Sequence, residues 1–110
     1  MMVMATPPDS TKNSLYYRLV THARAQWPQV ASLDVRYRGQ FAYVTAHLAD
    51  GSIQPLIRLR YSGSAHHWGF GLYLASSNHY EDQILPSGLP IGSPEEALDC
   101  ACGLYLGAPA

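Results

Sequence analysis

The chain has 110 residues, of which 47% are hydrophobic and 14% are charged, and its formal net charge is −1. This size fits one domain with one core, and the near-neutral charge argues against a strongly basic nucleic-acid coat. No apolar run approaches the roughly 20 residues that span a bilayer, so no membrane contact is expected.

The N-terminal segment and the cysteines indicate a cytoplasmic protein. Residues 1–10 lack the basic and apolar segments of a secretory signal and predict a flexible tail. Residues 11–110 are then expected to form a single α+β domain. Cys100 and Cys102 lie too close in sequence for a routine structural disulfide, so the fold need not form in an oxidising compartment.

The charges are divided unevenly along the chain. All seven Lys and Arg residues lie within positions 1–60, whereas positions 61–110 hold five of the eight acidic residues and no basic one. Such asymmetry favours an electrostatic partner.

A helix is predicted from Lys12 to Trp27. Its apolar positions recur at helical spacing and form one face: Leu15, Tyr16, Leu19, Val20, Ala23 and Trp27. Ser10 or Thr11 can cap its start, and Pro28 ends it.

Four segments of alternating hydrophobicity predict an antiparallel meander: Leu33–Arg38, Phe41–Ala49, Ser52–Tyr61 and His66–Ala75. Gly39-Gln40 and Asp50-Gly51 are typical of two-residue hairpin turns. Ser62–Ala65 would form a looser turn of four residues.

These turns set a register in which every inward row is apolar. The three rows are Val35, Val44, Ile57, Phe70; Tyr37, Ala42, Leu59, Trp68; and Leu33, Ala46, Pro55, Leu72. A slip of one residue would turn each row outward. Because Pro55 cannot donate to a ladder, we expect a break or bulge there between the third and fourth strands.

Residues 76–92 predict a long, irregular connection that packs down through its apolar residues. Ser93-Pro94-Glu95-Glu96 then predicts a helix start, with serine as the cap, proline at the first position and glutamate three residues after the cap. Leu98, Ala101, Cys102 and Tyr105 would form its buried stripe.

The expected fold is therefore α-β-β-β-β-α, with two helices packed on one face of a four-stranded antiparallel sheet. This order of elements resembles that of small nucleic-acid-binding domains of the double-stranded-RNA-binding and PUR/Whirly kinds. The resemblance covers topology only, because the chain carries no sequence motif of either family.

The same register places arginines and aromatic rings on the outward face. One row reads Arg38, Phe41, Arg60, His67, and the next reads Arg36, Tyr43, Arg58, Gly69. Each ring lies between two arginines that stand roughly 10 Å apart, since neighbouring strands are about 4.8 Å apart. Gly69 and Gly71 would leave the edge of this patch open.

These residues suit an anionic, flat ligand, because guanidinium groups bind phosphates and rings stack on bases. We therefore expect a small non-enzymatic binding domain for nucleic acid or another anionic partner. Two alternatives remain open: ordinary cross-strand contacts on an exposed sheet face, and an adaptor or homodimer that uses this face or a sheet edge. The acidic second half of another copy, or the acidic start of the last helix, could also cover the patch.

No cofactor and no metal site is predicted. A Cys-x-Cys pair on a helix directs its thiols about 200° apart, so Cys100 and Cys102 do not converge on one ion. A third, weaker hypothesis is a small enzyme with a site in the 76–92 segment, where His79, Tyr80 and Glu81 are the catalytic candidates.

Overall fold

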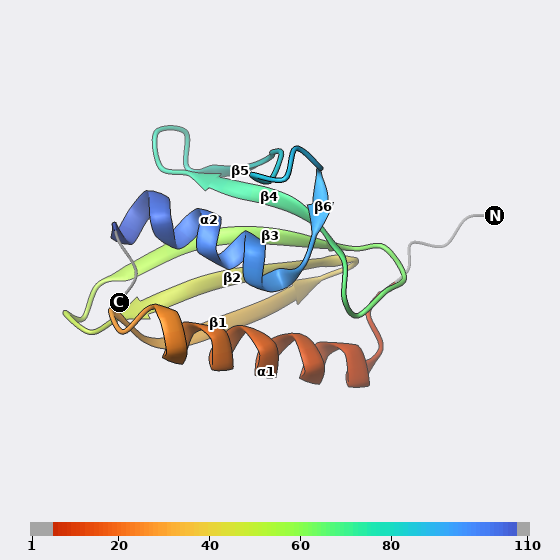
Figure 1. Ribbon diagram of the computed structural model, residues 1–110, viewed down its shortest axis with the longest axis horizontal. Helices are drawn as coiled ribbons and strands as arrows, with labels where there is room; N and C mark the ends of the chain where they lie inside the picture. Colours follow the sequence, from red (N-terminus) through yellow and green to blue (C-terminus); the bar gives the residue numbers. More distant parts are fainter. Residues whose placement is uncertain (1–5, 108–110) are drawn as a thin grey trace.

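The computed structural model describes residues 6–107 and confirms an α+β fold (Figure 1). Its elements in chain order are α1 (Asp9–Gln26), β1 (Val30–Arg38), β2 (Phe41–Leu48), β3 (Ile53–Tyr61), β4 (Trp68–Leu74), β5 (His79–Asp82), β6 (Ile91–Gly92) and α2 (Pro94–Leu106). Of the tail expected over residues 1–10, residues 1–5 lie outside the described part, and Asp9 and Ser10 already belong to α1. Neither helix within residues 6–107 is long and apolar enough to cross a membrane.

The sheet is antiparallel and has two more strands than the four predicted. Its order is β1-β2-β3-β4-β5, and β6 pairs with the part of β4 that β5 leaves uncovered. Between them, the backbone of Phe70 accepts a bond from the Gln83 amide (3.1 Å) and donates one to the Pro90 carbonyl (3.0 Å). The 76–92 segment is thus ordered by the backbone groups of β4, which need partners once they leave water.

The predicted row Val35, Val44, Ile57 is confirmed, but two deviations from the predicted geometry compensate for one another. The turn after β2 has three residues, because the Leu48 amide bonds to the Ser52 carbonyl (2.8 Å) around Gly51 at φ 91°. Leu56 then forms a bulge, since Val44 pairs with Ile57 while Thr45 pairs with Pro55. The bulge absorbs the extra residue of the turn.

Because of this bulge, the predicted position of Pro55 is wrong. The predicted break lay between the third and fourth strands, whereas the irregularity lies between β2 and β3. Pro55 pairs with Thr45 rather than Ala46, so it alternates to the outward face.

The register between β3 and β4 differs from the prediction by two residues. Ile57 lies opposite Leu72 rather than Phe70, because the connection contains six residues, 62–67, instead of four. Side-chain bonds hold this wider loop: Ser62 Oγ donates to the His67 carbonyl (3.2 Å), and Trp68 Nε1 donates to the Ala65 carbonyl (3.2 Å). A shift of two residues preserves the inward apolar rows, so hydrophobic alternation cannot distinguish the two registers.

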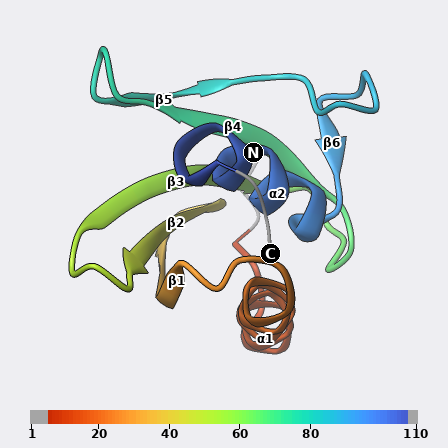
Figure 2. The same ribbon diagram turned by 60° about the vertical axis from the view of Figure 1, so that its left-hand side comes forward.

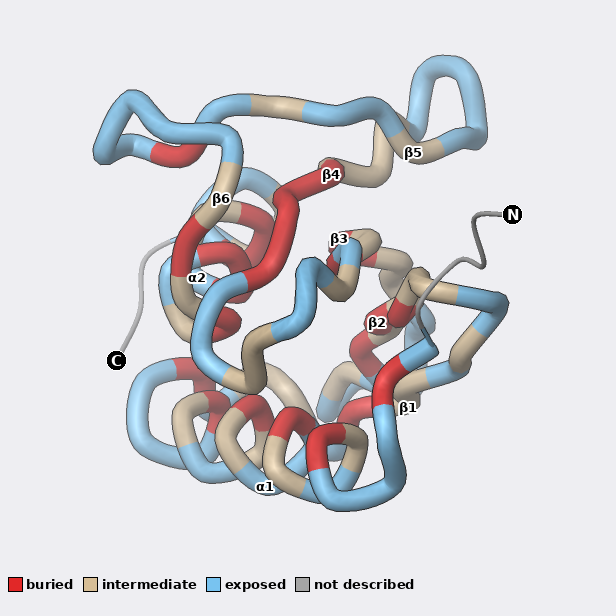
Figure 3. The backbone as a smooth tube through the Cα atoms, turned by 90° about the vertical axis from the view of Figure 1, so that its right-hand side faces the viewer, coloured by how far each residue is buried: buried red, intermediate tan, exposed pale blue. Residues whose placement is uncertain are grey.

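Both helices pack on one face of the sheet, and the core lies between them and the inward rows (Figures 2 and 3). From α1 the core receives Leu15, Leu19 and Ala23, followed by Trp27 just after the helix. Tyr16, predicted on the same apolar face, is instead 48% exposed. From α2 the core receives the predicted residues Leu98, Ala101 and Cys102, while Tyr105 is only partly buried.

The two helix starts differ in how they satisfy their free amides. At α2 the predicted capping box is confirmed: Ser93 Oγ accepts from the Glu96 amide, and the Glu96 carboxylate accepts from the Ser93 amide. At α1 neither Ser10 nor Thr11 caps the helix, which begins earlier, after Pro8, without a side-chain cap.

Two polar clusters fasten α1 to α2. Arg18 makes a bidentate contact with Glu95, with nitrogen–oxygen distances of 2.7 and 2.8 Å. Asp99 accepts a bond from Trp27 Nε1 (2.8 Å) and lies 2.7 Å from His22 Nε2. These contacts hold α2 on the inner face, so its acidic start does not cover the outward arginines.

Candidate functional site

The outward face of the sheet carries the arginines and rings that the sequence predicts. One row contains Arg38, Phe41, Arg60, Gly69 and Ile91, and the next contains Arg36, Tyr43, Arg58, Gly71 and Asp82. The first three members of each row are as predicted, because the turn before β2 has the expected length and the bulge at Leu56 offsets the extra residue in the turn before β3. The later members differ because of the β3–β4 register.

His67 is not part of this face. It was predicted opposite Arg60, but Gly69 occupies that position and β4 begins only at Trp68. His67 lies exposed in the 62–67 loop, where its carbonyl accepts the bond from Ser62.

Arg58 is the most enclosed of the four outward arginines. Its Nη2 lies 2.9 Å from Asp82 Oδ1, and its guanidinium carbon lies 4.8 Å from the ring centroid of Phe41. Its side chain is 22% exposed, and its Nε is buried without a hydrogen-bond partner among the described residues. Arg58 therefore supports the ring of Phe41 and joins β3 to β5, and the attraction of Asp82 makes it less available to an outside anion.

Arg36 also has an anionic neighbour, but a weak one. Its Nε lies 2.9 Å from Asp34 Oδ2, two residues back on the same strand and therefore on the same face. The side chain of Arg36 is 83% exposed, and ion pairs that exposed contribute between about 0 and 1 kcal/mol. Arg36 is therefore free to exchange Asp34 for another anion.

Arg38 and Arg60 are the cations on this face that have no ion pair within residues 6–107, and both are exposed. They flank Phe41 in one row of the ladder. Arg60 lies across β4, since a Cβ on Gly69 would stand only 3.0 Å from Arg60 Nε. Gly69 thus accommodates an arginine where the sequence predicted an open edge, and Gly71 does the same for Arg58.

The aromatic rings continue past the predicted patch onto β5. Tyr43 lies 6.3 Å from Phe41 and 5.1 Å from Tyr80 between ring centroids, and Tyr80 lies 5.4 Å from Tyr73. Burial raises the pKa of Tyr80, whose side chain also hydrogen-bonds with Thr45. The rings form one connected strip across β2, β4 and β5.

The sequence analysis named Tyr80 only as a catalytic candidate and did not place Tyr80 or Asp82 on the outward face, because it treated 76–92 as irregular. A signal was present: Ser76-Ser77-Asn78 is a turn-forming run, with Asn78 at φ 53°. The four residues after it contain one aromatic side chain and three polar ones, so their hydrophobicity does not alternate in a way that indicates a strand.

The residues considered for catalysis and metal binding do not converge. Alternation along β5 places Tyr80 on the outward face and His79 and Glu81 on the other, with His79 Nε2 3.8 Å from Glu81 Oε2. Burial, reinforced by Asp99, raises the pKa of Cys102 to about 12, and burial also raises the pKa of Cys100. No group of three or more metal-ligating side chains lies together in the part of the chain that the structure describes.

No known protein family, curated protein or solved structure matches this chain. The comparisons therefore add no function, and β5 and β6 add two strands to the element order on which the likeness to small nucleic-acid-binding domains was based.

Proposed function

We propose that the outward face of β1, β2 and β3 binds single-stranded nucleic acid. The observation that carries the proposal is the row Arg38, Phe41, Arg60, in which a partly exposed ring lies between two exposed guanidinium groups that lack an ion pair among the described residues.

The chemistry of this row suits both parts of a nucleotide. A guanidinium group donates two parallel hydrogen bonds to a phosphate, and a ring offers a stacking surface for a base of any identity. A base can stack on a protein ring only when it is outside a duplex, which favours single strands. The strip of Tyr43, Tyr80 and Tyr73 offers further apolar surface in line with Phe41.

The test is the affinity of the full chain for a fluorescently labelled oligo(dT) or oligo(U) of about ten nucleotides, measured by anisotropy at several salt concentrations. Each phosphate contact on a single strand contributes about −0.7 to the slope of log K against log salt. The double variant R38A/R60A is expected to make that slope shallower by about 1.4. F41L is expected to weaken binding about 5- to 150-fold, since one stacked base is worth about 1–3 kcal/mol.

Arg24 provides the matched control. It is an exposed arginine on α1, away from the outward face, so R24A removes the same charge without touching the row. If R24A loses as much affinity for the oligonucleotide as R38A or R60A does, the binding reflects general charge attraction and this site is refuted. An absence of binding at low salt, with the fold intact by circular dichroism, would refute the function.

A further inference from the structure

The sheet has two outer edges, and they differ in how open they are. The edge at β5 is four residues long and carries His79, Glu81 and Asp82. The edge at β1 is nine residues long, and no strand within residues 6–107 pairs with its outer side. Short, charged edges resist further pairing, whereas long ones invite it.

The hydrogen-bond pattern identifies the free groups on β1. The Tyr61 amide bonds to the Gln40 carbonyl (2.9 Å), so Gln40 directs its backbone groups toward β3. Because these directions alternate along a strand, Phe41 and Tyr43 direct theirs toward β1. The backbone groups of Arg38 and Arg36 therefore point toward β2, where they pair with Phe41 and Tyr43. The N–H and C=O groups of Leu33, Val35 and Tyr37 consequently point to the open edge.

We propose that the open edge of β1 pairs antiparallel with β1 of a second copy, about a two-fold axis that passes beside Val35. In this register Val35 faces Val35 of the second copy, and Leu33 faces Tyr37. The hydrogen bonds then form between the residues whose backbone groups are free, as antiparallel pairing requires.

The charges on β1 select this register over its neighbours. With the axis at Val35, Asp34 of each copy lies opposite Arg36 of the other, and both pairs attract. A shift that moves the axis to Asp34 places two aspartates face to face. A shift to Arg36 places two arginines face to face. The charges are therefore self-complementary in one of the three central registers and disfavour the register on either side.

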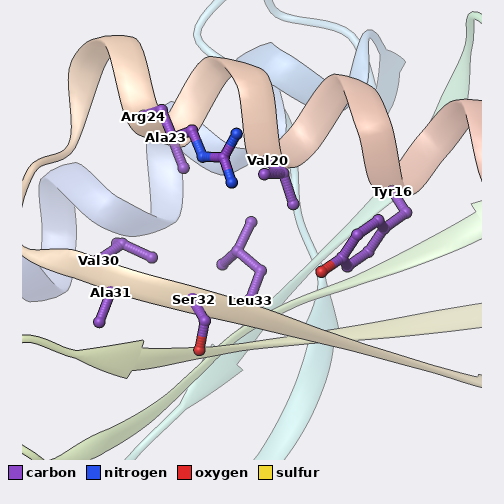
Figure 4. Close-up of a pocket in the computed structure, with 8 residues that line it drawn as sticks. All are labelled: Tyr16, Val20, Ala23, Arg24, Val30, Ala31, Ser32 and Leu33. Carbon is purple, nitrogen blue, oxygen red and sulfur yellow. The ribbon is translucent and has the colours of Figure 1, made fainter.

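A cleft with both polar and apolar lining lies beside the same edge, and a second copy would cover it. The cleft has a volume of about 80 Å³ and lies between α1 and β1, where Val20 and Leu33 point toward one another (Figure 4). Tyr16, which is 48% exposed, borders it. Tyr37 of the second copy would lie beside Leu33, on the side of the sheet that faces α1, and would shield this cleft from water.

The two-fold axis stands perpendicular to the sheet, so both copies keep their helices on one side and their arginines on the other. The outward faces then form one continuous surface. The pairing goes beyond the proposed nucleic-acid binding and does not depend on it, because it is measured on the protein alone.

The test is the mass of the full chain by light scattering and sedimentation from about 1 µM to about 1 mM, without nucleic acid. The wild-type mass should rise with concentration from the 12.1 kDa of one chain toward twice that value. D34R and R36D should each weaken the dimer about 10- to 100-fold, because each replaces two attractive pairs with two repulsive ones. An equimolar mixture of D34R and R36D should form a heterodimer, in which all four of these positions again meet an opposite charge.

R60D is the matched control, since it inverts a charge on the same face but away from the β1 edge. It should leave the dimer unchanged. A strict monomer at about 1 mM overturns the proposal. Dimers of equal strength in wild type, D34R and R36D overturn this register, as does a mixture that associates no better than its components. Each single variant lacks the Asp34–Arg36 pair within its own chain. Stronger association in the mixture therefore cannot come from that pair and must come from contacts between the two chains.

Discussion

Replacing Trp68 with alanine is expected to lower the free energy of unfolding by about 3–5 kcal/mol. Trp68 is 1% exposed, it is among the largest fully buried side chains in the structure, and its ring centroid lies 5.4 Å from that of Tyr61. The substitution opens a large cavity and also removes the donor to the Ala65 carbonyl. Because domains of this size are stable by about 5–15 kcal/mol, this loss is a substantial share of the total stability.

Urea denaturation followed by far-UV circular dichroism would measure this loss, since the other tryptophan complicates fluorescence. W68F retains an aromatic ring but not the Nε1 donor, so it should cost less than W68A. I53A is the surface control on the neighbouring strand: Ile53 is 62% exposed, and its loss should change stability by about 0.5 kcal/mol or less. A cost for W68A below about 1.5 kcal/mol would contradict the position of Trp68 at the start of β4.

Replacing Arg18 with methionine is expected to lower the free energy of unfolding at pH 7 by about 1–3 kcal/mol. Arg18 donates twice to Glu95, and its Nη1 lies 3.2 Å from the Ala65 carbonyl, so one side chain joins α1, α2 and the 62–67 loop. The side chains of Arg18 and Glu95 are 26% and 27% exposed, which keeps the cost below that of a fully buried pair. Methionine preserves most of the apolar stem.

The same pair predicts how stability depends on pH. Burial raises the pKa of Glu95, but the bonds from Arg18 and the backbone, together with the charges of Arg18 and His22, outweigh burial and lower the pKa below 4.5. A carboxyl whose pKa is lowered by folding stabilises the protein above its unfolded pKa. That stabilisation is lost as the pH falls through the folded value. The difference between wild type and R18M should therefore be largest near neutrality and should shrink in acid below about pH 4.5.

E95Q and the double variant R18M/E95Q complete a cycle that isolates the interaction. The two single losses should overlap, so that the double variant costs less than their sum. Additive losses, or a difference between wild type and R18M that stays constant from neutrality into acid, would show that Arg18 acts through packing alone.

The candidate site could be predicted from the sequence only where its geometry depends on nearby residues. The turn Gly39-Gln40 sets Arg38 opposite Phe41, so that part of the outward row followed from local chemistry. The position of His67 depended on the length of the 62–67 loop. That length is set by the bond from Ser62 to the His67 carbonyl and the bond from Trp68 to the Ala65 carbonyl. Hydrophobic alternation does not predict such bonds.

By itself the sequence determined the α+β class, the start of α2, the first hairpin and the inward row that pairs Val35 with Val44 and Ile57. Each of these depends on residues within a few positions of one another, as the capping bonds between Ser93 and Glu96 illustrate. Only the tertiary structure decided the β3–β4 register, the closing of the β4 edge by β5 and β6, and the pairing of Arg58 with Asp82. The physical reason is separation along the chain: Arg58 and Asp82 are 24 residues apart, and which charges meet follows from the whole sheet.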